Sequence, residues 1–325
     1  MAEWLYESGI GENRAILVED GAIIEAQIEL PGLRAGSVTD ARLTSILVPG
    51  RRGIATLGDG TEVLIEPLPK ATEGAAIRVE IIRKAIAEPG ALKRAKGRIT
   101  DADLREGPDL ANRIGPHRVI GIHDSDAFEA AGWTECLEEA ASGIVTFRGG
   151  TLRIVLTPAM TLIDIDGDGA PEPLAQAGAT AAARAIRKLG LAGNIGIDLP
   201  TVAGKAERQA IGAAFDDALP IPFERTAVNG FGFLQVIRPR ARASLCETVQ
   251  HQPAAACARA LMRRAQRSGI IGASTITANP EVCGIITAHG DWLSSLSAQI
   301  GGSVSLSPDP RPGRDQGSIA QDYRA

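Results

Sequence analysis

The sequence predicts an α/β protein made of several subdomains, and three patterns point to this class. Short apolar segments follow one another closely within the first hundred residues, a strand–helix–strand run occupies residues 160–198, and helices alternate with strands from residue 253. Closely spaced short strands are typical of a small barrel, and a strand–helix–strand run is typical of a parallel sheet. A chain of 325 residues with 44% hydrophobic residues can bury several small cores.

The first part of the chain is predicted to be all-β. Residues 14–18 and 23–28 flank Glu19-Asp20-Gly21, a combination typical of a β-hairpin. Turn residues then separate four further strand-like segments, at residues 42–48, 53–57, 62–66 and 76–82. We predict that these four segments form a small barrel and that the basic stretch 83–98 leads out of it.

The rest of the chain alternates between the two kinds of secondary structure. Apolar and Ala-rich spacing predicts helices at residues 104–114, 125–141, 174–189, 203–219, 253–267, 280–288 and 291–300. Ser125 or Asp126 is expected to cap the second of these helices. Strands are predicted at residues 118–122, 144–148, 152–156, 160–164, 195–198, 231–240, 272–277 and 303–307. From Pro308 onward Pro, Gly, Arg and Asp predominate, which predicts a flexible tail.

Both strands of the run 160–198 end in an aspartate, Asp164 in the first and Asp198 in the second. The carboxyl ends of parallel strands open into the same crevice, so we expect these two carboxylates to meet in space. Arg238 and Arg240 stand at the end of a later predicted strand, and arginine is well suited to hold a phosphodiester.

Asp164, Asp166 and Asp168 alternate in a Gly-containing turn, for which three interpretations stay open. The turn could be a solvated acidic loop, or a calcium site, although Ala175 stands where an EF-hand requires a glutamate. The third interpretation is a catalytic Mg²⁺ site with Asp164 and Asp198 as its ligands. Such a site needs few protein carboxylates, because Mg²⁺ keeps several waters and takes other oxygens from phosphate.

Composition argues against several classes of protein. No apolar run approaches the length of a membrane span, and the N-terminus carries acidic residues where a signal peptide is basic, so we expect a cytoplasmic protein without membrane contact. The cysteines at 136, 246, 257 and 283 form no C-x-x-C pair, which predicts free thiols and no zinc site. The net charge is −5, and no aromatic residue occurs between Tyr6 and Phe128, so a generic nucleic-acid-binding module is disfavoured.

Three segments, in order, resemble motifs of the ribonuclease E/G family. Residues 135–166 include GGTLRIVLTPAMTLIDID, similar to a Gly-Gly turn, an I-x-x-T-x-A-L strand and an I-D-[IV]-N-S loop. Residues 193–198, GNIGID, resemble GG-x-[IV]-[VI]-D. Residues 229–245, NGFGFLQVIRPRARASL, resemble FG-x-[LV]-[EQ]-[ML]-[ST]-R-x-R-x-x-x-SL. The resemblance extends over most of residues 10–310.

The resemblance implies a metal-dependent endoribonuclease that cuts single-stranded RNA and leaves 5′-phosphate and 3′-hydroxyl ends. It implies Asp164 and Asp198 as the ligands of Mg²⁺, which Mn²⁺ can replace, and Asp166 as a supporting catalytic residue where the family has an asparagine. Arg238, with Arg240 beside it, is implied to bind the RNA phosphate.

The resemblance also implies a domain order. An RNase H-like subdomain, residues 1–35 and 101–146, would be split by an S1-like barrel, residues 36–100. A DNase I-like catalytic subdomain at 147–248, a small α/β domain at 249–310 and a flexible tail at 311–325 would follow. The family's C-P-x-C zinc motif is missing from residues 246–257, so we expect that any homodimer is not linked by zinc.

Two other functions stay open at this stage. The chain could be a catalytically weak derivative of the family that binds RNA or a protein, because the barrel lacks aromatic residues and little room is left for the family's 5′-sensor domain. It could also be a calcium-stabilised structural domain. Retention of both Asp164 and Asp198 favours the enzyme.

Overall fold

The structure is a computed structural model that describes residues 1–88 and 91–322. It confirms the predicted α/β class and divides into two compact units. Unit 1 consists of Met1–Pro31, Ile114–Thr134 and Thr248–Ala325, and unit 2 of Gly32–Arg113 and Glu135–Glu247. Within the described residues, no helix combines the length and the apolar character needed to cross a membrane.

Unit 1 begins with a four-stranded sheet in the order β11-β1-β2-β3. Its strands are β1 (Glu3–Gly9), β2 (Glu12–Glu19), β3 (Ala22–Glu29) and β11 (Arg118–Val119). The predicted hairpin is confirmed as β2 and β3, and Gly21 in its turn has the positive φ of +80° that glycine tolerates. β1 was not predicted. It pairs in parallel with β11, which belongs to the segment of unit 1 that follows Arg113 in the chain.

The C-terminal part of unit 1 contains three predicted helices and a three-stranded sheet in the order β19-β18-β20. The elements are α7 (Pro253–Arg267), β18 (Ser274–Ala278), α8 (Pro280–Ala288), α9 (Gly290–Ile300), β19 (Val304–Pro308) and β20 (Ser318–Gln321). Leu261, Ile276, Ile286 and Leu296 are among the side chains of its buried core. The structure differs from the predicted flexible tail at β20, which pairs with β18, while residues 323–325 lie outside the described part.

The predicted barrel is present in unit 2 and closes in the order β10-β6-β5-β4-β7. Its strands are β4 (Val38–Val48), β5 (Arg52–Leu57), β6 (Glu62–Ile65), β7 (Ala76–Arg83) and β10 (Ala95–Ile99). The prediction that 83–98 leads out of the barrel is wrong, because β10 completes it after a hairpin of β8 (Ile86–Glu88) and β9 (Ala91–Lys93). Gly97 is required in β10, since a Cβ there would lie 2.5 Å from Val79 Cγ1.

Two predicted helices are shorter than expected. Only α1 (Leu110–Ile114) forms within residues 104–114. The predicted helix 125–141 is divided into α2 (Ala127–Ala130) and α3 (Trp133–Ser142), because Gly132 between them has a φ of +91°. Asp126 is the predicted cap of the first piece, and its side chain accepts a hydrogen bond from the Glu129 amide at 3.1 Å.

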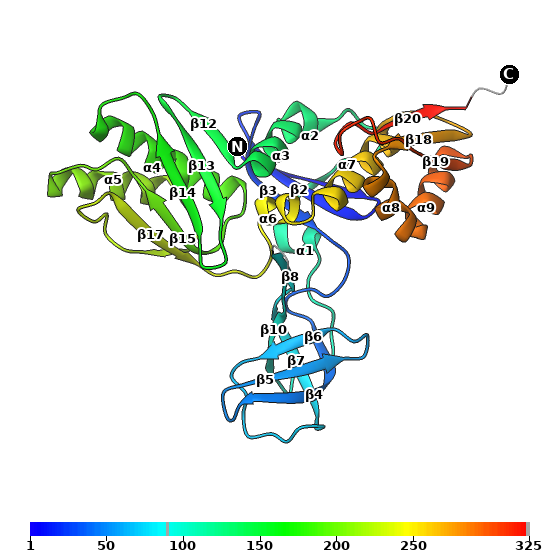
Figure 1. Cartoon of the computed structure of the whole chain (residues 1–325), viewed down its shortest axis with the longest axis horizontal. Coiled ribbons are helices and arrows are strands. Elements are labelled where there is room, and N and C mark those ends of the chain that lie inside the picture. The colour runs from blue at the N-terminus through cyan, green and yellow to red at the C-terminus, as the bar shows by residue number, and fades with distance from the viewer. Residues whose placement is uncertain (89–90, 323–325) are drawn as a thin grey trace. The chain divides into compact units, whose positions relative to one another are not determined.

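The second part of unit 2 is a six-stranded sheet in the order β12-β13-β14-β15-β17-β16. Its strands are β12 (Ile144–Phe147), β13 (Gly150–Leu156), β14 (Thr161–Asp166), β15 (Gly193–Asp198), β16 (Glu224–Arg225) and β17 (Phe233–Arg238). The helix α4 (Pro171–Lys188) joins β14 to the parallel strand β15, as predicted. α4 packs against α5 (Lys205–Ala218), and Figure 1 shows both helices beside this sheet. A short helix, α6 (Leu245–Gln250), follows.

Alternation along these strands separates two faces of the sheet. Ile163, Ile165, Ile195 and Ile197 are buried, and they share one face. The residues between them point to the opposite face, where Leu162 and Asp198 are exposed. We call this second side the open face of the sheet. Both Asp164 and Asp198 belong to it.

Candidate metal centre

The structure brings Asp164 and Asp198 together as the sequence pattern predicts. They are register partners on the parallel strands β14 and β15, with Asp164 two residues before the end of β14 and Asp198 at the end of β15. Partners of this kind lie about 5 Å apart at the backbone and point to the same face of the sheet. Two carboxylates on neighbouring strands can therefore share one cation, and carboxylate oxygens are the ligands that Mg²⁺ prefers.

The same row of the sheet contains a cation that the sequence analysis missed. Arg153 on β13 is the register partner of Asp164, so the open face presents Arg153, Asp164 and Asp198 side by side. The Arg153 side chain is exposed. The hairpin register could have identified it: counting back from the turn Thr157–Met160, which is closed by a Met160 amide to Thr157 Oγ1 bond of 3.1 Å, places Arg153 opposite Asp164.

The electrostatics of the row are dominated by its carboxylates. Partial burial, together with the negative charges of Asp166 and Asp198, raises the pKa of Asp164 above its ordinary value, and Arg153 acts in the opposite direction. Mutual repulsion of carboxylates is relieved when a divalent cation binds between them. The donor set of this row thus suits a hard divalent cation.

The acidic turn does not form the cage of a calcium loop. β14 remains extended through Asp166, which pairs with Thr151 on β13, so the backbone does not wrap at this point. Among the described residues, no group of three or more His, Cys, Asp or Glu side chains is close enough to hold a metal ion. Asp168 lies beyond the strand and is exposed. The geometry favours a two-carboxylate site over a calcium loop.

The two predicted phosphate ligands lie elsewhere on the sheet. Arg238 pairs with Gly193 at the start of β15, whereas Asp198 pairs with Phe233 at its end. Five residue steps separate the two positions, a distance of roughly 16 Å. By the same alternation Arg238 belongs to the helix-covered face, and its Nη1 donates to the Leu191 carbonyl. The register therefore does not support Arg238 as a ligand of a phosphate at the carboxylates.

Arg240 also has a structural contact. Its guanidinium forms an ion pair with Glu247 in α6. Glu247 in turn accepts a hydrogen bond of 2.8 Å from the Ser244 amide, and the Glu247 amide donates to Ser244 Oγ at 3.2 Å. This reciprocal pair is a capping box, which fixes the start of α6. Arg240 thus supports the cap of a helix.

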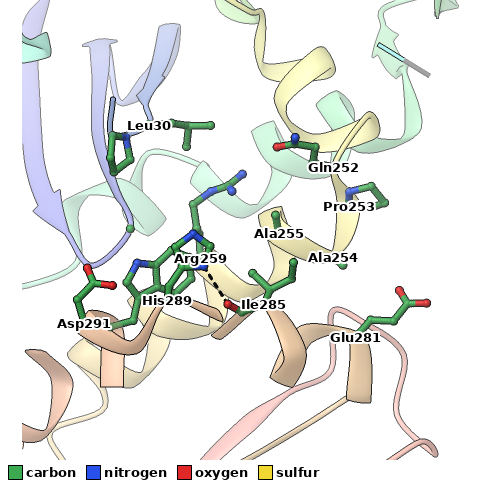
Figure 2. Close-up of a pocket in the computed structure, with 13 residues that line it drawn as sticks. Leu30, Gln252, Pro253, Ala254, Ala255, Arg259, Glu281, Ile285, His289 and Asp291 are labelled. Atoms are coloured by element: carbon green, nitrogen blue, oxygen red, sulfur yellow. Dashed lines mark hydrogen bonds between the residues drawn. The ribbon is translucent and has the colours of Figure 1, made fainter. Parts of the chain in front are cut away.

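A separate cavity of about 730 Å³ lies within unit 1. Figure 2 shows Arg259 pointing into it and His289 donating from Nδ1 to the Ile285 carbonyl at 2.9 Å. Two of its charged groups are paired: Arg259 Nε contacts Glu12 at 2.7 Å, and Glu281 contacts Arg314 at 2.6 Å. The cavity contains none of the predicted site residues. The candidate site is therefore the row of Arg153, Asp164 and Asp198 with Asp166 beside it, which we call the acidic row.

The cysteines are free, as predicted, and Cys136, Cys246 and Cys283 are buried. Burial raises the pKa of Cys136 and of Cys246 to about 12, which makes both thiols poor nucleophiles.

Comparison with known proteins identifies no family. No family model matches the chain, and no curated protein is significantly similar to it. The functional interpretation therefore depends on the site itself.

The raised pKa of Asp164 predicts how cation binding responds to pH. The carboxylate must be ionised to bind, so protons compete with the cation and affinity falls as the pH falls through this pKa. Because the pKa is raised, we expect the loss to begin at a higher pH than for an ordinary aspartate. Asp166→Asn removes one cause of the shift and should move the midpoint to lower pH, as measured by Mn²⁺ titration across a pH series. The exposed Asp217, changed to Asn, should leave the midpoint unchanged, and a midpoint that rises in Asp166→Asn would contradict this account.

Proposed function

We propose that the chain is a metal-dependent endoribonuclease of the ribonuclease E/G family that cleaves single-stranded RNA to 5′-phosphate and 3′-hydroxyl ends. The observation that carries the proposal is the register pairing of Asp164 with Asp198 at the carboxyl ends of two parallel strands. The order of the three sequence segments that resemble the family supports it.

Each residue of the acidic row has its own role in this proposal. Asp164 and Asp198 would hold Mg²⁺, or Mn²⁺ in its place, and Asp166 adds negative charge beside them. A metal ion there supplies an activated water and neutralises charge that develops on the phosphate. Arg153 places a guanidinium next to Asp164, where it can hold a non-bridging phosphate oxygen and where its charge favours the ionised form of Asp164.

We also propose a family assignment for each subdomain, and a location and partners for the protein. The closed barrel would correspond to an S1-like domain, the sheet of unit 2 to a DNase I-like subdomain and the first sheet of unit 1 to an RNase H-like subdomain. We further propose a cytoplasmic protein whose partner is single-stranded RNA and which associates, where it does, as a homodimer without a zinc link.

The proposal is tested by incubating the purified protein with a labelled single-stranded oligoribonucleotide in Mg²⁺ or in EDTA. We expect cleavage in Mg²⁺ alone, and products that carry a 5′-phosphate and can be ligated directly. Metal-independent cleavage, or products with a cyclic phosphate, would overturn the proposed chemistry.

One observation favours a second candidate, an RNA- or protein-binding derivative with little activity. The barrel contains no aromatic residue on which bases could stack, and several of its basic side chains are already paired with acids of the barrel. Examples are Arg52 with Glu66 at 2.7 Å and Arg98 with Glu80 at 2.7 Å. RNA binding in the same assay without Mg²⁺-dependent cleavage would select this alternative.

The proposal predicts different roles for two arginines. Arg153→Gln should weaken RNA binding and reduce the slope of log K against log salt by about 0.7, the value for one phosphate contact in a single strand. Arg238→Gln should leave this slope unchanged but lower the melting temperature, because it loses the contact with the Leu191 carbonyl. Binding is measured by fluorescence anisotropy at several salt concentrations in EDTA. A salt slope that changes only in Arg238→Gln would restore the original assignment.

A further inference from the structure

Phe231 is an exposed aromatic ring beside the acidic row. Its exposed fraction is 85%, and it is the only aromatic residue classed as exposed among those that the structure describes. Every other described ring is buried or half-buried, as in the contact of Phe215 with Phe223 at 5.5 Å between centroids. Single exposed apolar side chains are common on protein surfaces, so the position of Phe231 decides what its ring can contact.

The position of Phe231 follows from the sheet register. Phe233 is the partner of Asp198, and the ladder continues with a Leu199 amide to Gly232 carbonyl bond of 3.1 Å. Phe231 is two residues before Phe233, which corresponds to at most about 7 Å of extended chain. The ring therefore emerges at the same end of the sheet as the two carboxylates.

The backbone that carries this ring is held firmly. Asn229 Oδ1 accepts hydrogen bonds from the amides of Phe231 at 2.9 Å and Phe233 at 3.0 Å. Thr201 Oγ1 donates to the Phe231 carbonyl at 3.2 Å, which ties the turn to the segment directly after Asp198. Gly232 has a φ of +90°, and a Cβ there would lie 2.2 Å from the Leu199 carbonyl oxygen. An exposed ring on a fixed turn is preorganised for a flat partner.

The neighbouring ring, Phe233, packs against the sheet. A Cβ on Gly196 would lie 2.5 Å from Phe233 Cζ, so the missing side chain of Gly196 makes room for the Phe233 ring across β15. Phe233 is half-buried in this position, whereas no ring contact of Phe231 is found among the described residues. Among the described aromatic rings, Phe231 is the one that offers a free face at this end of the sheet.

We infer that Phe231 is a base-stacking residue, which holds a nucleobase of single-stranded RNA next to the phosphate at Asp164 and Asp198. This inference rests on the proposed function and deepens it. Nucleobases stack on aromatic rings without regard to sequence, and each such contact contributes substantially to affinity. The stacking ring that is absent from the barrel is thereby supplied by the catalytic sheet.

The test is binding of a labelled single-stranded oligoribonucleotide, measured by fluorescence anisotropy in EDTA so that no cleavage occurs. We expect Phe231→Ala to weaken binding roughly 5- to 140-fold, the effect of losing one stacked base. Phe231→Trp should restore binding, and Phe231→Leu should not. Ile237→Ala, which removes an exposed apolar side chain from β17, the strand that follows the Phe231 turn, serves as the matched control and should bind as the wild type does.

A second arm locates the base. An oligonucleotide series with a single abasic site at successive positions should weaken binding to the wild type at one position, and this loss should disappear in Phe231→Ala. If the wild type binds RNA but Phe231→Ala or Phe231→Leu binds equally well, the inference fails while the proposed function stands. If the wild type binds no RNA, both fail. Loss of self-association in Phe231→Ala, with RNA binding intact, would assign the ring to a protein contact and overturn the inference.

Discussion

Replacement of Asp198 by asparagine is expected to lower the Mg²⁺-dependent cleavage rate by roughly 10³-fold or more. Asparagine keeps the size of the side chain but removes one of two negative charges that would hold the cation. The variant also removes one cause of the raised pKa of Asp164, so Asp164 becomes easier to ionise. Loss of activity would then reflect the missing ligand and not protonation of its neighbour. The measurement is the single-turnover cleavage of a labelled oligoribonucleotide.

The folded state of this variant should be intact. Asp198 is exposed at the end of its strand, so the melting temperature is expected to match that of the wild type. Asp217→Asn provides the matched control, because it removes an equally exposed aspartate from α5. Full activity of Asp198→Asn at saturating Mg²⁺ would exclude Asp198 as a ligand.

Replacement of Arg263 by methionine is expected to lower the free energy of unfolding of unit 1 by about 3 kcal/mol or more, in the range for breaking a buried ion pair. Arg263 is buried in an ion cluster formed by Glu7, Glu12, Arg14, Asp126, Glu129, Arg259, Arg263 and Arg267. Its guanidinium contacts Glu7 at 3.2 Å and Asp126 at 2.7 Å. Methionine preserves much of the volume but removes one of the cations that surround the buried carboxylate of Glu7.

Tryptophan fluorescence during urea unfolding measures this effect. Trp4, Trp133 and Trp292 all lie in unit 1, so the signal reports on the unit that contains the ion cluster. Arg118→Met is the matched control, because Arg118 forms an ion pair with Glu3 in which both side chains are more than half exposed. Exposed pairs contribute about 1 kcal/mol or less. Equal destabilisation by the two variants would contradict the importance of burial.

The ion cluster could not have been predicted from the sequence. Arg259, Arg263 and Arg267 are spaced four residues apart in α7, and such a stripe is normally a solvated helix face. Their partners Glu7 and Glu12 are more than 240 residues away along the chain. Only tertiary contact shows that these charges are buried together.

The local spacing of apolar residues was sufficient to predict the strands and helices in which apolar and polar residues alternate. The strands that carry Asp164 and Asp198, the helix between them and the barrel strands before Arg83 all follow from it, although β14 continues beyond Asp164 to Asp166. β10 was missed because its inward positions are Ala95 and Gly97, small residues that give no apolar signal. Gly132 was predicted to lie within a helix, but its positive φ separates α2 from α3.

The two carboxylates of the candidate site were predicted from the sequence, but the neighbouring cation was not. The order of strands implied that Asp164 and Asp198 would meet, because parallel strands present their carboxyl ends together. Arg238 was predicted beside them because it ends a strand and because the resemblance implies a phosphate ligand there, but β17 is antiparallel to β15 and therefore ends at the opposite edge. The same reasoning about direction assigns the neighbouring cation to Arg153.

The most direct test of the acidic row is titration with Mn²⁺, followed by electron paramagnetic resonance, for the wild type, Asp198→Asn and Asp217→Asn. We expect a single Mn²⁺ site in the wild type and in Asp217→Asn, and its loss in Asp198→Asn. Mn²⁺ binding that is undiminished in Asp198→Asn, or absent from the wild type, would contradict the claim that Asp164 and Asp198 together hold a divalent cation.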